Sequence, residues 1–224
     1  MSVAAVLSIG TELTRGELLN GNARWLAERL VDLGFTVVEH TAVPDDAERI
    51  RRTLLRLARE VKVIVCTGGL GPTSDDLTTA VVADALGVGL ARDAASIAKI
   101  EARYRAHARP MLEMSRKQAD FPQGARILPN DPCTAPGFSV QVEHARAFFM
   151  PGVPSEMEHI FEAHIAPLLA DPQSGLVVRR THQIHIRTFG TYESAVAERL
   201  RDLELSSARQ QHDITLSYRV KIQE

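Results

Sequence analysis

Residues 63–76, VIVCTGGLGPTSDD, decide the fold expected for this chain. The apolar run at 63–65 is unbroken, which is typical of a parallel strand that is covered on both faces. A glycine-rich turn and two aspartates follow it and lead into a predicted helix over 77–86. A strand that enters a helix through such a turn is typical of α/β proteins that bind phosphate groups at this position.

The three glycines of the turn predict a phosphate-binding loop. Gly68, Gly69 and Gly71 can adopt positive φ and carry no Cβ, so their amides can close around an anion. The first turn of the helix over 77–86 would add unpaired amides and the positive end of the helix dipole. No G-x-x-x-x-G-K-[ST] motif occurs, and the dinucleotide fingerprint lacks its third glycine at Ser74.

Asp75 and Asp76 predict a divalent cation beside this loop. Two carboxylates would repel a bound phosphate unless a hard cation lay between them, which favours a Mg²⁺-bridged nucleotide or sugar phosphate. The alternative is structural: either aspartate could cap the following helix, an interaction that stabilises by about 1 kcal/mol.

Strand and helix alternate three times before residue 87, which predicts a three-layer, mostly parallel α/β sheet of Rossmann-like topology. Ligands of such sheets bind at the carboxyl ends of the strands, so Gly10, Thr11 and Glu12 join the glycine loop as candidates. Asp45 and Glu48 form a predicted capping box. The expected strands and helices span 3–9, 20–33, 35–43, 45–60, 63–65 and 77–86.

Two further loops are candidates for ligand contact. The stretch 129–137, PNDPCTAPG, predicts a rigid surface turn, and such loops often carry function. In PGVPSEM at 151–157, Gly152 lets the backbone approach a ligand, whereas Ser155 could donate a hydroxyl or cap a helix reaching Leu169. The other expected elements are helices over 93–119 interrupted at Pro110, from which Lys117 and Gln118 could reach the ligand, and strands at 137–142 and 145–149.

The composition is that of a globular protein: 224 residues, 45% hydrophobic and 24% charged. The net charge of −2 gives no reason to expect nucleic-acid or membrane binding. No apolar run approaches the roughly 18 residues of a membrane span, and we expect a cytoplasmic protein. Cys66 and Cys133 have no partners at ligand spacing, so we expect both to be reduced.

The domain organisation is predicted from a linker at 171–175. We expect a large domain over 1–170 and a small α+β domain over 171–224, with strands at 176–188 and 214–222 around a helix at 192–203. His159 and His164 would lie about 140° apart around an α-helix, too far for a metal pair. His182 and His185 would fall on opposite faces of a strand, so structural roles are expected for all four.

Five blocks in order resemble the amino-terminal part of the CinA (competence/damage-inducible) family, which has a MoaB/Mog-like, molybdopterin-binding fold. The small domain resembles the KH-type domain of that family but lacks a G-x-x-G loop. The blocks are SIGTELTRGELLNGNARWLAERL at 8–30, TGGLGPTSDDLT at 67–78, KQADFPQGARILPN at 117–130, TAPGF at 134–138 and PGVPSEM at 151–157.

The resemblance implies metal-dependent hydrolysis of ADP-ribose to AMP and ribose 5-phosphate, with Mg²⁺ or Co²⁺ as the cation. Asp76 matches the acidic residue implicated in the chemistry, Asp75 is a second metal ligand, and either of them or Glu12 could be the general base. The ligand-binding residues implied are Gly10, Thr11, Thr67, Gly68, Gly69, Gly71, Thr73, Thr134, Ala135, Pro136, Gly152 and Ser155.

Two other functions stay open: a molybdopterin- or nucleotide-binding protein or adenylyltransferase of molybdenum-cofactor metabolism, and a non-catalytic nucleotide sensor. A homo-oligomer is expected by analogy. Cys133 stands where the family has glycine and could narrow the pocket. Relatives often continue into a domain that deamidates nicotinamide mononucleotide, an activity not expected of a chain ending at Glu224.

Overall fold

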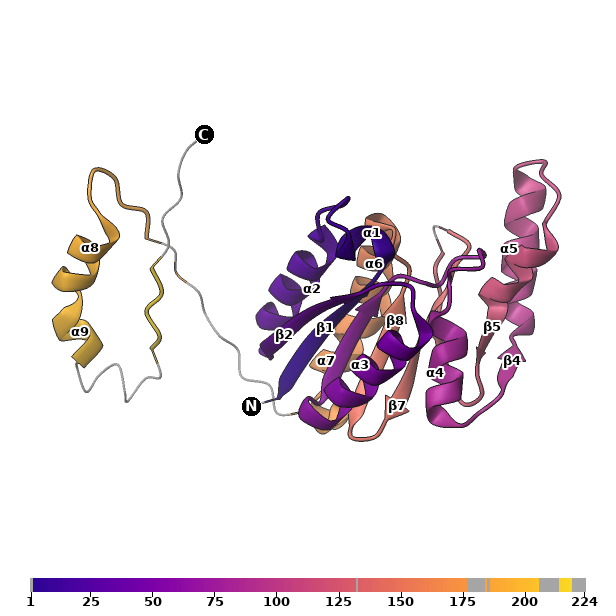
Figure 1. Ribbon diagram of the computed structural model, residues 1–224, viewed down its shortest axis with the longest axis horizontal. Coiled ribbons are helices and arrows are strands. Elements are labelled where there is room, and N and C mark those ends of the chain that lie inside the picture. Colours follow the sequence, from indigo (N-terminus) through magenta and orange to yellow (C-terminus); the bar gives the residue numbers. More distant parts are fainter. Residues whose placement is uncertain (1, 132, 177–183, 185, 206–213, 219–224) are drawn as a thin grey trace. The chain divides into compact units, whose positions relative to one another are not determined.

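The computed structural model (Figure 1) consists of two compact units, Met1–Thr181 and His182–Glu224, and each is described by itself. The 3₁₀ turn Pro172–Ser174 follows the last helix of the first unit, and Leu176 packs against that unit's core. The structure describes residues 2–131, 133–176, 184, 186–205 and 214–218.

A six-stranded sheet forms the centre of the first unit, in the order β2-β1-β3-β8-β7-β6. The strands β2, β1, β3 and β8 pair in parallel, whereas β7 runs antiparallel to both β8 and β6. The predicted mostly parallel α/β fold is therefore confirmed. The strands are β1 (Val3–Ile9), β2 (Thr36–Val43), β3 (Val63–Thr67), β6 (Arg126–Leu128), β7 (Gly137–Val142) and β8 (Ala145–Met150).

Helices cover both faces of this sheet, as Figure 1 shows. Strand β1 explains why, because its side chains alternate: Ala5 and Leu7 pack in the core beneath one helix layer, Ala4 and Val6 in the core beneath the other. The first layer holds α3 (Ala47–Glu60) and α4 (Thr78–Leu86); the second holds α2 (Gly21–Asp32), α6 (Pro154–Ile160), the π-helical segment η2 (Phe161–Ile165) and α7 (Ala166–Ala170).

The remaining elements of this unit lie beyond the main sheet. Strand β5 pairs antiparallel with β4 and contacts α4. The predicted interruption between residues 93 and 119 is confirmed, since an α-helix ends before Pro110 and a 3₁₀ helix follows. These elements are α1 (Thr11–Thr14), β4 (Leu90–Arg92), α5 (Ala94–Ala106), the 3₁₀ helix η1 (Glu113–Ala119) and β5 (Asp120–Pro122).

The predicted cap at Asp45 is wrong, and so is the alternative in which Ser155 caps a helix. Asp46, not Asp45, caps α3, because its carboxylate accepts the Arg49 N–H at 2.9 Å. Ser155 does not cap α6, since the N-cap is Val153 and proline occupies the first helical position, where its missing N–H is no loss. Both side chains are thereby left for other contacts.

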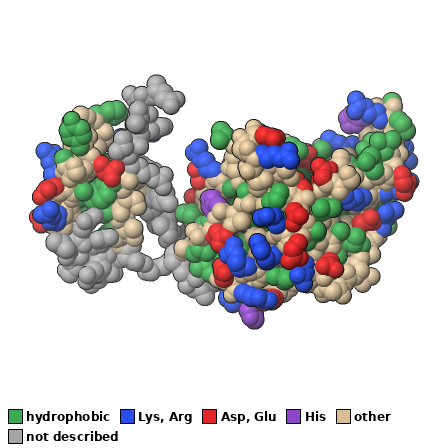
Figure 2. Space-filling model, viewed as in Figure 1, with side chains coloured by type: hydrophobic (Ala, Val, Ile, Leu, Met, Phe, Trp, Pro, Cys, Tyr) green, Lys and Arg blue, Asp and Glu red, His purple; other side chains and the backbone are tan. Residues whose placement is uncertain are grey.

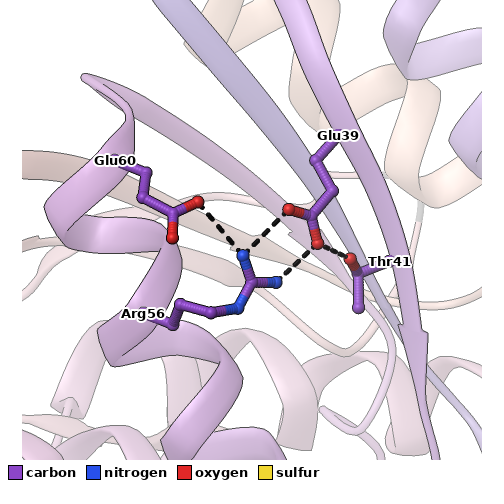
Figure 3. A network of polar contacts seen from close by, with 4 residues as sticks. All are labelled: Glu39, Thr41, Arg56 and Glu60. Carbon is purple, nitrogen blue, oxygen red and sulfur yellow. Dashed lines mark hydrogen bonds and ion pairs between the residues drawn. The ribbon is translucent and has the colours of Figure 1, made fainter.

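The surface of the first unit is charged but mixed in sign. On the face shown in Figure 2, basic and acidic side chains are interspersed over the α/β unit. One group of them, which we call the Arg56 cluster, joins α3 to β2 (Figure 3) and consists of Glu39, Thr41, Arg56 and Glu60. No helix among the described residues is long and apolar enough to cross a membrane.

The second unit contains α8 (Glu193–Arg199) and α9 (Arg201–Leu205), which together confirm the predicted helix over 192–203. The two strands predicted around it lie largely outside the described residues, as do His182 and His185. The described parts of those segments, residues 176, 184, 186–188 and 214–218, are not in strands.

Candidate functional site

The carboxyl ends of β1, β3 and β8 lie side by side, and we call this side of the sheet the carboxyl edge. Ser8 pairs with Thr67, and Thr67 with Met150, in the parallel register. Strand β7 runs the opposite way and begins at Gly137, so the loop before it opens at the same edge. The predicted residues thus lie in four segments at this edge, 10–12, 67–76, 134–136 and 152–155, of which the first includes the start of α1 and the last the start of α6.

The glycine loop is packed so closely that it excludes side chains. Gly68 has φ of +106°, and a Cβ on it would lie 2.0 Å from the carbonyl oxygen of Ile9. Gly69 has φ of +68°, and its Cβ would lie 2.2 Å from Oγ1 of Thr78. The prediction of positive φ is confirmed at these two positions. Gly71 is not left-handed, but a Cβ there would lie 2.5 Å from a carboxylate oxygen of Asp76.

The first turn of α4 forms hydrogen bonds with the glycine loop, and no aspartate side chain caps it. Thr78 donates its N–H to Gly69 O at 3.2 Å and its hydroxyl to Gly68 O at 3.0 Å. The N-cap residue is Leu77, without a side-chain cap. The alternative that Asp75 or Asp76 caps this helix is therefore wrong, and the Thr78 amide is already occupied within the protein.

Asp75 and Asp76 instead converge on one hydroxyl, and we call these two residues and Thr73 the Thr73 cluster. The Thr73 Oγ1 lies 2.5 Å from Oδ1 of Asp75 and 2.6 Å from Oδ2 of Asp76, which also accepts the Thr73 N–H at 2.8 Å. A hydroxyl has one proton and donates to one acceptor at a time. The Thr73 hydroxyl and the Asp75 backbone N–H lower the pKa of Asp75, as does the charge of Lys117 to a smaller extent.

The donor set of the Thr73 cluster fits a hard divalent cation. Two carboxylates and a hydroxyl offer oxygen ligands only, and Mg²⁺ is usually held by one or two carboxylates together with substrate phosphates. No group of three or more His, Cys, Asp or Glu suited to a metal occurs in the described part of the chain. A cation here would therefore share its coordination with a ligand. Lys117 lies beside the loop, its Nζ donating to Thr73 O at 2.7 Å.

The loop after β1 is held by a residue that the sequence interpretation missed. Oδ2 of Asp45 accepts both the N–H and the hydroxyl of Thr11, each at 2.8 Å. Exposed Glu12 folds back so that its Oε1 lies 2.5 Å from where a Cβ on Gly10 would stand. The Asp-Asp pair at 45–46 is the sequence signal, since one carboxylate is enough to cap α3.

Asn22 is a second missed residue, and it joins the loops after β3 and β8. Its Nδ2 donates to Thr67 Oγ1 at 3.2 Å and to Gly152 O at 2.8 Å. The Thr67 hydroxyl in turn donates to Pro151 O at 2.9 Å. The polar NGN sequence at 20–22, placed just before an amphipathic helix, could have indicated such a role.

The loop before β7 is tied to α6. Nδ2 of buried Asn130 donates to Ala135 O at 3.0 Å and to Oε2 of Glu156 at 2.6 Å. Burial raises the pKa of the Cys133 thiol, as does its hydrogen bond to Glu156. Exposed Ser155 borders a groove of about 530 Å³, which is lined by Trp25, Ser155, Glu158, His159, Glu162 and Ala163.

Known proteins with a similar sequence and fold exist. The family described as "Probable molybdopterin binding domain" matches residues 5–171. The solved structure of the protein CinA from Thermoplasma acidophilum, described as having unknown function, is 30% identical, with a TM-score of 0.69 over 75% of this chain and 98% of that one. The chain belongs to the CinA-like family and has a molybdopterin-binding-type domain. The KH-type identity of the second unit stays a prediction.

Other relatives support the family and the fold. A CinA-like protein of Frankia casuarinae is 42% identical over 89% of this chain but 47% of its own length, so the chain spans about half of such relatives. A molybdopterin biosynthesis protein from Mycobacterium abscessus is 14% identical, with a TM-score of 0.51 over 75% of this chain and 92% of its own, and shows the fold alone.

Proposed function

We propose that this member of the CinA-like family is a metal-dependent hydrolase that cleaves the pyrophosphate bond of ADP-ribose. The observation that carries the proposal is the Thr73 cluster, where three oxygen atoms converge within 2.6 Å contacts beside a glycine loop that admits no side chain. A cation held by these oxygen atoms beside phosphates in the glycine loop would support pyrophosphate hydrolysis, since it would stabilise the charge that develops on the phosphoryl oxygens.

In this proposal each group of residues has a separate role in the reaction. Asp75 and Asp76 would hold Mg²⁺ or Co²⁺, which when bound neutralises phosphate charge and lowers the pKa of a water ligand. The amides of Gly69 and Gly71 and the Lys117 ammonium would bind the phosphates. The Gly68 N–H, predicted to join them, instead donates to Met150 O at 2.9 Å. The oxygen of water would form a new bond to phosphorus as the bridging P–O bond breaks, giving AMP and ribose 5-phosphate. Glu12, exposed at the same edge, is a candidate to accept the water proton.

A second candidate is binding of molybdopterin without turnover, which the family match over residues 5–171 favours. The glycine loop would hold the terminal phosphate of the pterin in the same way. The two functions differ in whether the Thr73 cluster acts on a phosphorus–oxygen bond. A homo-oligomer, expected from the resemblance, also stands as a proposal, which light scattering on the purified protein would check.

AMP release from ADP-ribose in Mg²⁺ or Co²⁺ tests the hydrolase. We expect Asp76→Ala to lower kcat/KM about 100-fold, which corresponds to about 2.7 kcal/mol of lost transition-state stabilisation. Asp84→Ala is the matched control, because Asp84 is an aspartate of α4 whose ion pair joins it to Arg51. Absence of AMP with either metal would reject the hydrolase, and saturable molybdopterin binding by the same preparation would then support the second candidate.

A further inference from the structure

The helix after β8 contains a π-helical turn that changes which side chains meet. The segment η2, Phe161–Ile165, lies between α6 and α7. In an α-helix, residues five apart point about 140° away from each other. A π turn bonds residue i to residue i+5, which brings such residues onto one side of the helix.

His159 and His164 are the residues that this turn brings together. Their ring centroids lie 6.5 Å apart, with an angle of 87° between the ring planes. The expectation that the two imidazoles point in different directions is therefore wrong, because it assumed an uninterrupted α-helix. Single π turns within α-helices occur frequently at functional sites.

Both imidazoles have an unsatisfied nitrogen. The Nε2 atoms of His159 and His164 are buried, and neither has a hydrogen-bond partner in the described part of the structure. Leaving such a group buried and unpaired destabilises the folded protein. Two unpaired nitrogens on neighbouring rings add their free-energy costs. A metal ion that accepts an electron pair from each nitrogen would remove both costs.

A carboxylate and a groove accompany the pair. Asp131 forms an ion pair with Lys99 at 3.0 Å, and its pKa is lowered mainly by that lysine and to a smaller extent by both histidines. Asp131 therefore lies within electrostatic reach of both rings. His159 also lines the 530 Å³ groove with Glu158 and Glu162, so one residue of the pair borders space open to solvent.

We propose that His159 and His164 form a binding site for a first-row transition-metal ion such as Zn²⁺ or Cu²⁺, coordinated through the two Nε2 atoms. Imidazole is a preferred ligand of these ions, whereas Mg²⁺ prefers oxygen ligands. Water would complete the coordination.

The site is independent of the proposed hydrolase, since it lies on the helix after β8 rather than in the loop after β3 and uses nitrogen rather than oxygen ligands. Its test is direct metal binding to the purified chain in the presence of excess Mg²⁺, which occupies oxygen-ligand sites. Titration calorimetry with Zn²⁺ would give the affinity, and electron paramagnetic resonance of the Cu²⁺ form would show whether imidazole nitrogens are ligands.

We expect equimolar binding that weakens at least tenfold in His159→Phe and in His164→Phe, which keep a planar ring without a nitrogen. His144→Phe, at an exposed turn between β7 and β8, is the matched control and should bind normally. Asp75→Asn should also leave the affinity unchanged. Unaltered affinity in the double variant H159F/H164F, or a Cu²⁺ spectrum without nitrogen coupling, would overturn the proposal; circular dichroism would verify that the variants fold.

Discussion

The Arg56 cluster and the Thr73 cluster contain the same kinds of group but balance their charge differently. In the Arg56 cluster (Figure 3), a threonine hydroxyl contacts Glu39, and the Arg56 guanidinium bonds Glu39 at 2.5 and 2.9 Å and Glu60 at 3.1 Å. In the Thr73 cluster, a hydroxyl contacts two carboxylates, and the nearby Lys117 ammonium bonds the carbonyl of Thr73 instead. In the first cluster one guanidinium binds both carboxylates and offsets one of their two charges. In the second, neither aspartate forms an ion pair among the described residues, and both charges are available to a bound cation.

The comparison shows that a lowered pKa does not by itself mark a functional carboxylate. The pKa of Glu39 is lowered mainly by its hydrogen bond from Arg56 and then by Thr41. The pKa of Asp75 is also lowered, but chiefly by the Thr73 hydroxyl. Both glutamate and aspartate therefore stay charged to lower pH, and only the absence of a bound guanidinium leaves Asp75 available to a cation.

The largest expected effect is on stability and comes from the glycine loop that precedes the Thr73 cluster. Gly68→Ala would place a Cβ against the backbone of Ile9 at positive φ, so we expect unfolding to become easier by about 3 kcal/mol or more. Gly124→Ala is the matched control, because Gly124 has φ of +82° with open space around it, and should cost about 1 kcal/mol. Urea denaturation measures both, and equal losses would show that close packing of the loop is not what holds it.

Removing the threonine hydroxyl from each cluster should change the rate of AMP release in one cluster and not in the other. Thr73→Val would leave the carboxylates of Asp75 and Asp76 without their shared partner, and we expect AMP release to fall about tenfold, or about 1.4 kcal/mol. Thr41→Val removes the equivalent hydroxyl from the Arg56 cluster and should leave the rate within about twofold. If the two substitutions reduce the rate equally, the difference drawn between the clusters is not a functional one.

Removing the guanidinium should affect stability alone. Arg56→Gln is expected to lower the free energy of unfolding by about 1 kcal/mol or less, because the arginine and its two carboxylates are substantially exposed. Thermal denaturation would measure this loss, with Arg24→Gln, which breaks a single exposed pair with Glu28, as the control. A change in the rate of AMP release would place Arg56 in the functional site.

The smallest effect concerns pH. Because the folded pKa of Glu39 lies below its ordinary value of 4.5, its ion pair stabilises the protein above that pH and is lost as pH falls through the folded pKa. The stability difference between the wild type and Glu39→Gln should be a few tenths of a kcal/mol at neutral pH. Urea midpoints measured from pH 7 downward should converge, whereas a difference that grows on acidification would contradict the assignment.

Long, regular features of the sequence predicted most of the fold. The helices α2 and α3 were expected close to where they lie because their apolar periodicity runs over many residues, and the strands β1 and β3 because their apolar runs are nearly continuous. Strands β4, β5 and β6 were missed, since three residues are too short to display a period. The glycine loop and both aspartates were placed correctly at the carboxyl edge, because topology alone brings them there.

Details set by tertiary contacts were beyond the sequence. Asp45 and Asp46 are equally good helix caps by composition, and only the position of Thr11 decides that Asp45 binds the neighbouring loop. The meeting of His159 with His164 depends on one π turn, for which no periodicity in the sequence gives a signal. In both cases the residues were visible in the sequence, but the local backbone conformation decides which groups their side chains contact.

The amide of Asn22 has a mechanical consequence. One NH₂ group bonds both Thr67 and the carbonyl of Gly152, and the Gly68 N–H bonds Met150 O. A fluctuation that lifts either loop must break bonds of the other, so the two loops open as one unit. Their backbone amides should exchange with deuterium at a common rate, and shortening Asn22 to alanine should uncouple the two rates.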